Sequence, residues 1–352
     1  MTRDDRIRLL EQKADAHVLV LDGAMGTQIQ DLKLDETAFR GDRFAGWNSP
    51  LAGNNDLLNL TQPDAIRAIH QRYFEAGSDI VESNTFSSTP IAQSDYGLAE
   101  YAAEIAEAGA RIAREAADAV ETDDRPRAVA GAIGPTSKTL SISPDVNDPG
   151  QRAASFDDIY SSYTQQAHAM AEHVDFFLVE TMFDTLNGKA AIKALLDHRG
   201  STGVFIPILL SGTIPDASGR TLSGQTTEAM WNSIRHAKPW AVGFNCALGA
   251  TQLRAHVAEI SRVADTRVLA YPNAGLPNEM AEYDETPSET AAHLAEWASA
   301  GLVNIVGGCC GTTPAHIAAI ADGVADTVPR QVVKDKPVAM RLSGLEAFDI
   351  AG

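Results

Sequence analysis

One hydrophobic pattern recurs along the chain. A short apolar run rich in β-branched residues is followed by a turn rich in Gly, Asn and Thr, and then by an Ala-rich segment with helical spacing. Near-continuous apolar runs are typical of strands buried on both faces, and their alternation with helices indicates a parallel sheet. The runs lie at residues 17–26, 79–86, 127–137, 175–183, 206–214, 240–249, 267–275 and 302–311.

Helical spacing is clearest in four segments between these runs, at residues 63–77, 98–120, 185–198 and 286–301. Eight strand–helix units fit a closed barrel better than an open, doubly wound sheet. The glycine patterns GxGxxG and GxxxxGK[ST], typical of nucleotide-binding open sheets, do not occur. The predicted fold class is therefore α/β, a (β/α)8 TIM barrel with its active site at the C-terminal rim of the strands.

The predicted barrel takes up residues 1–330. Residues 331–352 have no strong period, which predicts a C-terminal linker or strap. Two connections, 27–62 and 136–152, are longer than a barrel requires. Because long connections at the C-terminal ends of barrel strands usually build or cover a site, the chemistry is expected there.

Charge and hydropathy narrow the possible partners. With 28 Lys and Arg against 47 Asp and Glu, the formal charge of -19 would repel a polyphosphate backbone, so no nucleic acid is expected. The chain has no apolar run of about 18 residues and no basic, apolar leader, which argues against a membrane partner and against secretion. The predicted location is cytoplasmic.

Three cysteines are the strongest chemical signal. Cys246 ends the sixth run, whereas Cys309 and Cys310 follow the eighth within a Gly-Gly-Cys-Cys-Gly turn flexible enough to aim both sulfurs at one ion. Zinc bound by three protein ligands keeps a fourth position open for water or substrate. The alternative is that they are small buried residues at tight strand ends. A redox pair is disfavoured because adjacent cysteines form strained disulfides and no CxxC occurs.

Motifs at all eight predicted strand ends carry a family resemblance from about residue 17 to 345: LDGAMGT, ESNTF, GPTSKTLSISPDVNDP, VETMFDT, SGTIPDASGRTLSGQTTEA, GFNCALG, YPNAGLPN and GGCCGTTP. The chain resembles the homocysteine-binding module of cobalamin-dependent methionine synthase, within the wider family of homocysteine S-methyltransferases. The resemblance implies a (β/α)8 barrel, zinc held by the catalytic Cys246, Cys309 and Cys310, and homocysteine as the methyl acceptor.

The same resemblance suggests how the amino acid is held. Asp22 and Glu180 match acidic positions that the family uses near the substrate ammonium, and the backbone N–H groups of Gly23 and Ala24 are candidates for the carboxylate. Without the resemblance, the two acidic residues would read equally well as a strand-end cap or an internal ion pair. Further candidate substrate contacts are Asn245 and Ser137.

Metal coordination explains why cysteine thiols are expected as the ligands of this site. A free thiol with a pKa near 8.5 is mostly protonated at neutral pH, and coordination removes its proton. Three thiolate ligands make the site anionic, which should leave a fourth, substrate thiolate electron-rich. Before homocysteine binds, the open position is expected to hold the side-chain oxygen of Asn273 or a water molecule.

The methyl donor is expected to come from elsewhere. In the enzyme that the chain resembles, further modules bind methyltetrahydrofolate and cobalamin, but this sequence lacks the DxHxxG pattern of the cobalamin module. The predicted donor is methylcobalamin that is not bound stably by this chain. It would be supplied by a cobalamin- and folate-binding methionine synthase subunit in trans, although an excised module remains the alternative to a separate subunit.

Other interpretations remain open. A self-contained enzyme would use a small donor such as betaine or S-methylmethionine, but SISPDVNDP and SGTIPDASGRTLSGQTTEA favour the cobalamin-dependent branch. A non-catalytic, zinc-binding scaffold would need a closed site with four ligands, and the sequence has no fourth cysteine. The sequence also leaves open whether homocysteine is the only acceptor thiol.

Overall fold

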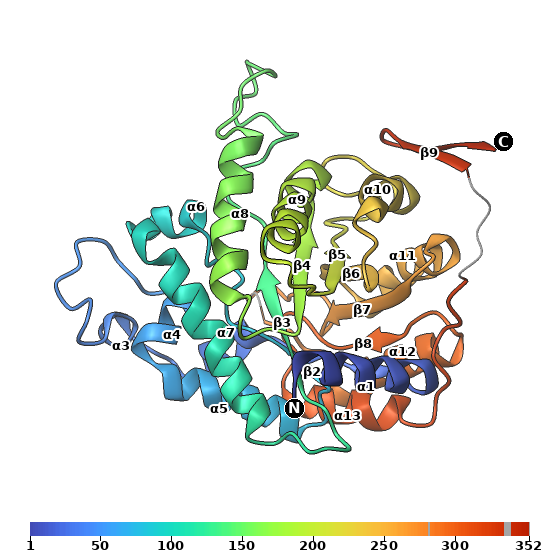
Figure 1. The fold of residues 1–352 in the computed structure, drawn as a ribbon, viewed down its shortest axis with the longest axis horizontal. Coiled ribbons are helices and arrows are strands. Elements are labelled where there is room, and N and C mark those ends of the chain that lie inside the picture. Colours follow the sequence, from blue (N-terminus) through green and yellow to red (C-terminus); the bar gives the residue numbers. More distant parts are fainter. Residues whose placement is uncertain (281, 334–338, 352) are drawn as a thin grey trace.

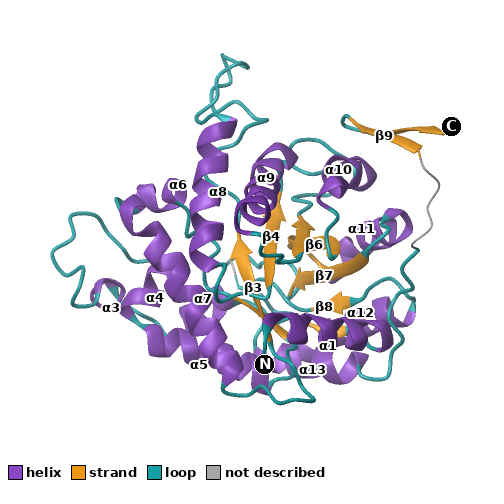
Figure 2. Ribbon diagram, in the orientation of Figure 1, coloured by secondary structure: helices purple, strands orange, loops and turns teal. Residues whose placement is uncertain are grey.

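The computed structural model describes residues 1–280, 282–333 and 339–351. Eight parallel strands lie in the spatial order β1-β8-β7-β6-β5-β4-β3-β2, and helices surround them (Figures 1 and 2). The strands are β1 (Leu19–Val20), β2 (Ile80–Glu82), β3 (Ala128–Ile133), β4 (Phe176–Met182), β5 (Ile208–Gly212), β6 (Ala241–Gly249), β7 (Arg267–Asn273) and β8 (Ile305–Val306).

The sheet closes between its first two strands. Leu21 and Ile80 form a parallel bridge, and the Asp79 backbone N–H donates to the Val20 carbonyl oxygen at 2.7 Å. The Asp79 carboxylate in turn accepts the Val20 N–H at 3.1 Å. These contacts join the two ends of the strand order and confirm the predicted (β/α)8 barrel.

Alternating side chains build the two layers of the core, as the period of a strand requires. In β3, Ala128 and Ala130 face the barrel interior, whereas Val129 packs in the outer layer under the helices. In β4, Phe176 and Leu178 face inward and Phe177 faces outward. Both faces of each strand are therefore apolar, which is why the strands read as continuous hydrophobic runs in the sequence.

The helices cover the outside of the barrel, and the four segments with clear helical spacing correspond to α5, α7, α9 and α12. None of the helices in the described part of the chain is both long and apolar enough to cross a bilayer. The helices are α1 (Arg3–Ala16), α2 (Met25–Asp31), α3 (Glu36–Arg40), α4 (Leu58–Thr61), α5 (Pro63–Glu75), α6 (Pro90–Gln93), α7 (Ala102–Asp118), α8 (Phe156–Met170), α9 (Thr185–Thr202), α10 (Thr227–Ile234), α11 (Ala250–Val263), α12 (Pro287–Ser299) and α13 (Pro314–Val324).

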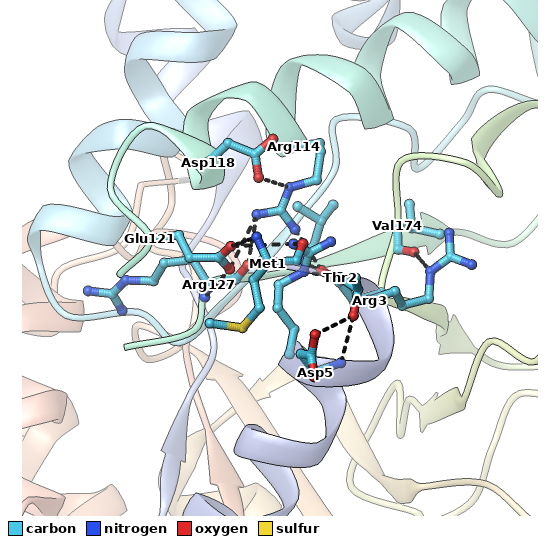
Figure 3. Close-up of polar contacts among 12 residues, drawn as sticks. Met1, Thr2, Arg3, Asp5, Arg114, Asp118, Glu121, Arg127 and Val174 are labelled. Atoms are coloured by element: carbon cyan, nitrogen blue, oxygen red, sulfur yellow. Dashed lines mark hydrogen bonds and ion pairs between the residues drawn. The ribbon is translucent and has the colours of Figure 1, made fainter. Parts of the chain in front are cut away.

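Helix α1 closes the N-terminal end of the barrel. Its Leu10 and Ala14 are buried in the same cluster as the inward-facing strand residues. Polar contacts fasten the helix in place, and Figure 3 shows Arg3 reaching the carbonyl oxygen of Val174, a hydrogen bond of 2.7 Å. Because this end is filled, any cavity in the barrel must open at the opposite end, where the strands terminate.

The two long connections have different structures. Residues 27–62 contain most of α2 together with α3, a short 3-10 helix (Asn55–Leu57) and α4. The connection before α8 is irregular and extends beyond the end of that helix, and Val146 near its tip is 95% exposed (Figure 1).

The C-terminal segment contains an antiparallel hairpin, β9 (Ala339–Ser343) and β10 (Ala347–Ala351). The hairpin packs against α10: the Ser343 hydroxyl donates to the Ala229 carbonyl oxygen at 2.6 Å, and Gln225 donates to Ser343 at 2.9 Å. The division at residue 330 between barrel and linker or strap stays a prediction.

Candidate active site

Three sulfur atoms converge at the C-terminal end of the barrel. Cys246 lies near the end of β6, and Cys309 and Cys310 lie in the loop after β8. The three Sγ atoms all lie within 4.8 Å of one another, and Cys246 and Cys310 are 3.7 Å apart. All three cysteines are free thiols of intermediate burial. Cys246 and Cys309 are 63 positions apart in the sequence, so the fold brings them together and not any local motif.

An unusual backbone aims Cys246 at its partners. Cys246 and Ala247 both have left-handed φ angles, +60° and +57°. They interrupt the ladder between β6 and β7, whose register shifts between Asn245 and Gly249. Left-handed non-glycine residues cost about 1 kcal/mol or more each and persist where the surroundings enforce them. The strain at the end of β6 is consistent with a functional requirement for this sulfur position.

The loop after β8 is held from both sides. The Cys309 N–H donates to the Pro272 carbonyl oxygen at 2.8 Å, and the Ala274 N–H donates to the Cys310 carbonyl oxygen at 2.9 Å. Glycine is required at position 308, where a Cβ atom would lie 2.5 Å from the Thr312 side chain. These bonds fix the adjacent cysteines against the end of β7, so both sulfurs keep one orientation.

Asn245 supports the sulfur cluster from below. Its side-chain N–H group donates to Cys309 Sγ at 3.7 Å and to the Thr181 hydroxyl at 2.9 Å. Its Oδ1 atom accepts from the Thr181 N–H at 3.0 Å and from the Ser211 hydroxyl at 2.7 Å. With every polar atom of its amide engaged, the fully buried Asn245 is a rigid support for Cys309.

The cysteine cluster fits a tetrahedral metal ion. Zinc–sulfur bonds of 2.3 Å at tetrahedral angles place two sulfurs about 3.8 Å apart, close to the 3.7 Å between Cys246 and Cys310. Hydrogen bonds from Cys246 and Cys309 lower the pKa of Cys310, which favours the thiolate form of this sulfur. At the end of β7, the Oδ1 atom of Asn273 is buried without a hydrogen-bond partner, as suits a ligand oxygen.

A cavity of about 1100 Å³ opens above the sulfurs. Of the described residues, those lining it include three aromatic side chains and no Lys, Arg or His. A cavity with this lining has a strongly negative potential and favours cationic groups. Its carboxyl residues are Asp31, Asp56, Glu82, Asp95, Glu180, Glu282 and Asp284.

Three carboxyl groups form a cluster beside the sulfurs, which we call the carboxyl cluster: the buried Asp22 and Glu180 and the half-buried Glu82. Asp22 Oδ2 accepts the backbone N–H of Glu82 at 3.0 Å, while Asp22 Oδ1 and Glu82 Oε1 are buried without a partner. Glu180 accepts from the Tyr271 hydroxyl at 3.4 Å. The strands β1, β2 and β4 thus bring three acidic groups together without a cation.

Burial raises the pKa of all three groups. The pKa of Glu180 rises to about 8, chiefly through burial. Burial and the neighbouring charges of Glu180 and Asp22 raise the pKa of Glu82 well above its usual value. Burial also raises the pKa of Asp22. Ionisation of the cluster is therefore costly without a cation beside it, and a bound cation would favour the ionised forms.

The predicted site residues divide into two groups by position. Those that line the cavity are Gly23, Ala24, Ser137, Glu180, Cys246, Cys309 and Cys310. Asp22, Asn245 and Asn273 are at most 2% exposed and do not line it. The Ala24 N–H donates to the Thr312 hydroxyl at 3.1 Å. Binding of a substrate carboxylate by the Gly23 and Ala24 amides, and by Ser137 and Asn245, stays a prediction.

Sequence reasoning missed three residues of the site. Glu82 is the first letter of the ESNTF motif, which contributed to the resemblance without being given a role. Asp56 is buried, accepts from the Ser87 N–H and the Ser88 hydroxyl at 2.7 Å each, and has its pKa raised to about 6 by burial. Tyr283, in the loop after β7, lines the cavity beside Gly311, whose φ of +81° leaves no room for a Cβ.

A sequence model of the family described as homocysteine S-methyltransferase matches residues 19–324, most of the chain. Among solved structures, the homocysteine methyltransferase MmuM from Escherichia coli in its metallated form superposes with a TM-score of 0.70. It is 22% identical and covers 90% of this chain and 99% of that chain. The oxidized form of the same protein gives a TM-score of 0.69 at 20% identity, with the same coverage. At these identities the structural likeness extends to the fold.

Proposed function

The chain belongs to the homocysteine S-methyltransferase family, and from this premise we propose that it is a zinc-dependent enzyme that transfers a methyl group to the sulfur of homocysteine, giving methionine. The observation that carries the proposal is the convergence of Cys246, Cys309 and Cys310 at the floor of an acidic cavity. Zinc bound by these sulfurs would supply a Lewis acid that lowers the pKa of an entering thiol.

The surrounding residues have defined tasks in this proposal. Asn245 holds Cys309 through its side-chain N–H, which keeps the sulfur in place when a ligand exchanges. The carboxyl cluster receives the substrate ammonium, and the cysteine cluster receives the thiol through the metal. The unpaired Oδ1 of Asn273 supports its proposed role as fourth ligand in the free enzyme. Zinc coordination in Asn273→Ala that matched the native free protein would rule this role out.

We propose methylcobalamin, presented by a separate cobalamin- and folate-binding subunit, as the methyl donor. A cavity of about 1100 Å³ is far larger than homocysteine needs, and it opens at a rim that a large donor can approach. In the transfer, a sulfur–carbon bond forms and the cobalt–carbon bond breaks, leaving the electron pair on cobalt. The thiol proton is lost to solvent before the transfer.

One observation favours a second candidate donor. Among the described residues, the cavity lining carries carboxyl groups and no basic side chain, which suits a small cationic donor such as S-methylmethionine. In that case this chain alone would complete the reaction, without a partner protein.

The test is to supply the zinc-loaded protein with homocysteine and, in separate reactions, methylcobalamin, betaine or S-methylmethionine, and to measure methionine. Methionine formed only with methylcobalamin would support the first donor, whereas methionine formed with a small donor would select the second. Cys246→Ser serves as the matched control, because it removes one metal ligand while preserving the volume of the side chain. No methionine from any donor would contradict the proposed function.

A further inference from the structure

The carboxyl cluster contains more acidic groups than the family resemblance accounts for. The resemblance assigns Asp22 and Glu180 to the substrate ammonium, but Glu82 is close enough to interact electrostatically with both. Glu82 lines the cavity, its charge couples to both neighbours, and its Oε1 atom is buried without a hydrogen-bond partner. Buried polar oxygens normally find partners, so an unpartnered carboxyl oxygen on a residue that lines a cavity points to a ligand group that would complete the site.

The contacts within the cluster also hold Glu82 in place. Its backbone N–H donates to Asp22 Oδ2 at 3.0 Å, which ties the end of β2 to the end of β1. Asp22 Oδ1 is buried without a hydrogen-bond partner. On the other side, Glu180 has the Tyr271 hydroxyl as a weak donor at 3.4 Å. Each carboxyl group therefore retains acceptor capacity that the protein itself does not use.

Charge decides which ligand group is missing. Burying three carboxyl groups together is costly unless a cation accompanies them, and the cavity lining among the described residues provides none. A neutral hydrogen-bond donor would satisfy the orphan oxygens but would not offset the accumulated negative charge. An ammonium group does both, because it has three N–H donors and a positive charge.

We propose that Glu82 binds the substrate ammonium directly, and that it forms with Asp22 and Glu180 a three-carboxyl cage that selects α-amino thiols over thiols without an amino group. This assignment rests on the proposed function, since it deepens the recognition of the same substrate. The cysteine cluster recognises the sulfur, and the carboxyl cage recognises the other end of the molecule.

The experiment measures binding of two thiols by isothermal titration calorimetry to the zinc-loaded full chain. Homocysteine carries the ammonium, and 4-mercaptobutyrate is the same molecule without its amino group. We expect Glu82→Gln to weaken homocysteine binding by about 10- to 100-fold, the usual cost of losing a charged hydrogen bond, and to change 4-mercaptobutyrate binding by less than about twofold. Zinc content is expected to stay unchanged.

Glu279→Gln is the matched control, because it makes the same charge change at an exposed residue in the loop after β7, outside the cavity lining. It should leave both affinities within about twofold of the native values. A thermal midpoint for Glu82→Gln at or above that of the native protein would confirm that the variant folds.

Equal weakening of both thiols by Glu82→Gln, or no weakening of either, would overturn the assignment of Glu82 while leaving the proposed function intact. A native protein that binds homocysteine no better than 4-mercaptobutyrate would overturn the whole cage. A native protein that binds neither thiol would overturn the proposed function, and the assignment with it.

Discussion

The two ends of the barrel treat buried charge in opposite ways. At the N-terminal end, Asp175 is buried but paired, with Arg6 Nε at 2.8 Å from one carboxylate oxygen and Arg114 Nη1 at 2.8 Å from the other. At the C-terminal end, Asp22 and Glu180 are buried and Glu82 is half-buried, and none of them has a cationic partner in the part of the chain that the structure describes. Two of their oxygens lack any hydrogen-bond partner. The paired charges at the N-terminal end stabilise the fold, whereas the unpaired carboxyl groups at the C-terminal end are available to bind a ligand.

The ion pairs lie at the closed end of the barrel, whereas the carboxyl cluster lies at the end where the cavity opens. Arg6 belongs to α1, so its ion pair with Asp175 helps to fix the helix that fills the N-terminal end. Repulsion among the ionised groups of the carboxyl cluster lowers the stability of the fold, and a bound cation would relieve it. Loss of stability at a functional site is common in proteins. The following predictions test this contrast.

The largest effect is expected at the metal centre. Cys246→Ser removes one of three sulfur ligands, and we expect it to lower zinc affinity by at least about 100-fold and to abolish methionine formation. Zinc content after dialysis and methionine yield are the measurements. Full zinc content and turnover in this variant would contradict the role of the cysteine cluster.

A substitution among the ion pairs at the N-terminal end is expected to lower the free energy of unfolding more than a substitution in the carboxyl cluster. Asp175→Asn removes the buried carboxylate that Arg6 and Arg114 share and leaves them only Glu121 and Asp118, so the free energy of unfolding should fall by about 3 kcal/mol. Urea denaturation provides the measurement. A loss below about 1 kcal/mol would mean that the ion pairs at this end contribute little to stability.

Homocysteine binding is expected to strengthen as pH rises. The pKa of Glu180 is raised to about 8 by burial, so this carboxyl is largely protonated at pH 6.5 and ionised at pH 8.5. Because only the ionised form attracts an ammonium, affinity should rise by about tenfold between these values, relative to 4-mercaptobutyrate at each pH. Glu180→Gln should remove this dependence. If the affinities of the native protein for both thiols changed with pH in the same way, the role of Glu180 in ammonium binding would be contradicted.

The smallest effect concerns stability at the open end. Glu180 has a higher pKa in the folded protein than the usual 4.5, so its ionisation lowers stability as pH rises from about 4.5 to about 8. At pH 8.5, Glu180→Gln is therefore expected to raise the thermal midpoint by about 2–4 °C, with little change at pH 4. A lower midpoint at pH 8.5 would show that the carboxylate is stabilised by the protein itself.

The fold could be predicted from the sequence because both faces of each strand are apolar, which makes the eight hydrophobic runs easy to recognise. The predicted runs are longer than the strands: the run at 302–311 contains only β8, Ile305–Val306, since its remaining residues bend into the cysteine loop. The convergence of the three cysteines could be predicted for a related reason. All parallel strands end at the same rim, so residues that follow them meet in space.

Other parts of the site depend on contacts that no sequence pattern encodes. An acidic residue at the end of one strand is unremarkable, and Glu82 gains its significance only from its closeness to Asp22 and Glu180 on other strands. Tyr283, ten residues after the end of β7, lines the cavity through the tertiary fold, which no local pattern around it encodes. The left-handed backbone at Cys246 was equally invisible, because neither Cys246 nor Ala247 is a glycine.

The central claim is that three protein sulfurs hold a zinc ion whose remaining position accepts the sulfur of homocysteine. X-ray absorption at the zinc edge, recorded on the zinc-loaded protein before and after adding homocysteine, tests it most directly. We predict three sulfur ligands and one oxygen or nitrogen ligand in the free protein, changing to four sulfur ligands with homocysteine. A zinc ion with fewer than three sulfur ligands, or a sulfur count that homocysteine leaves unchanged, would contradict the claim.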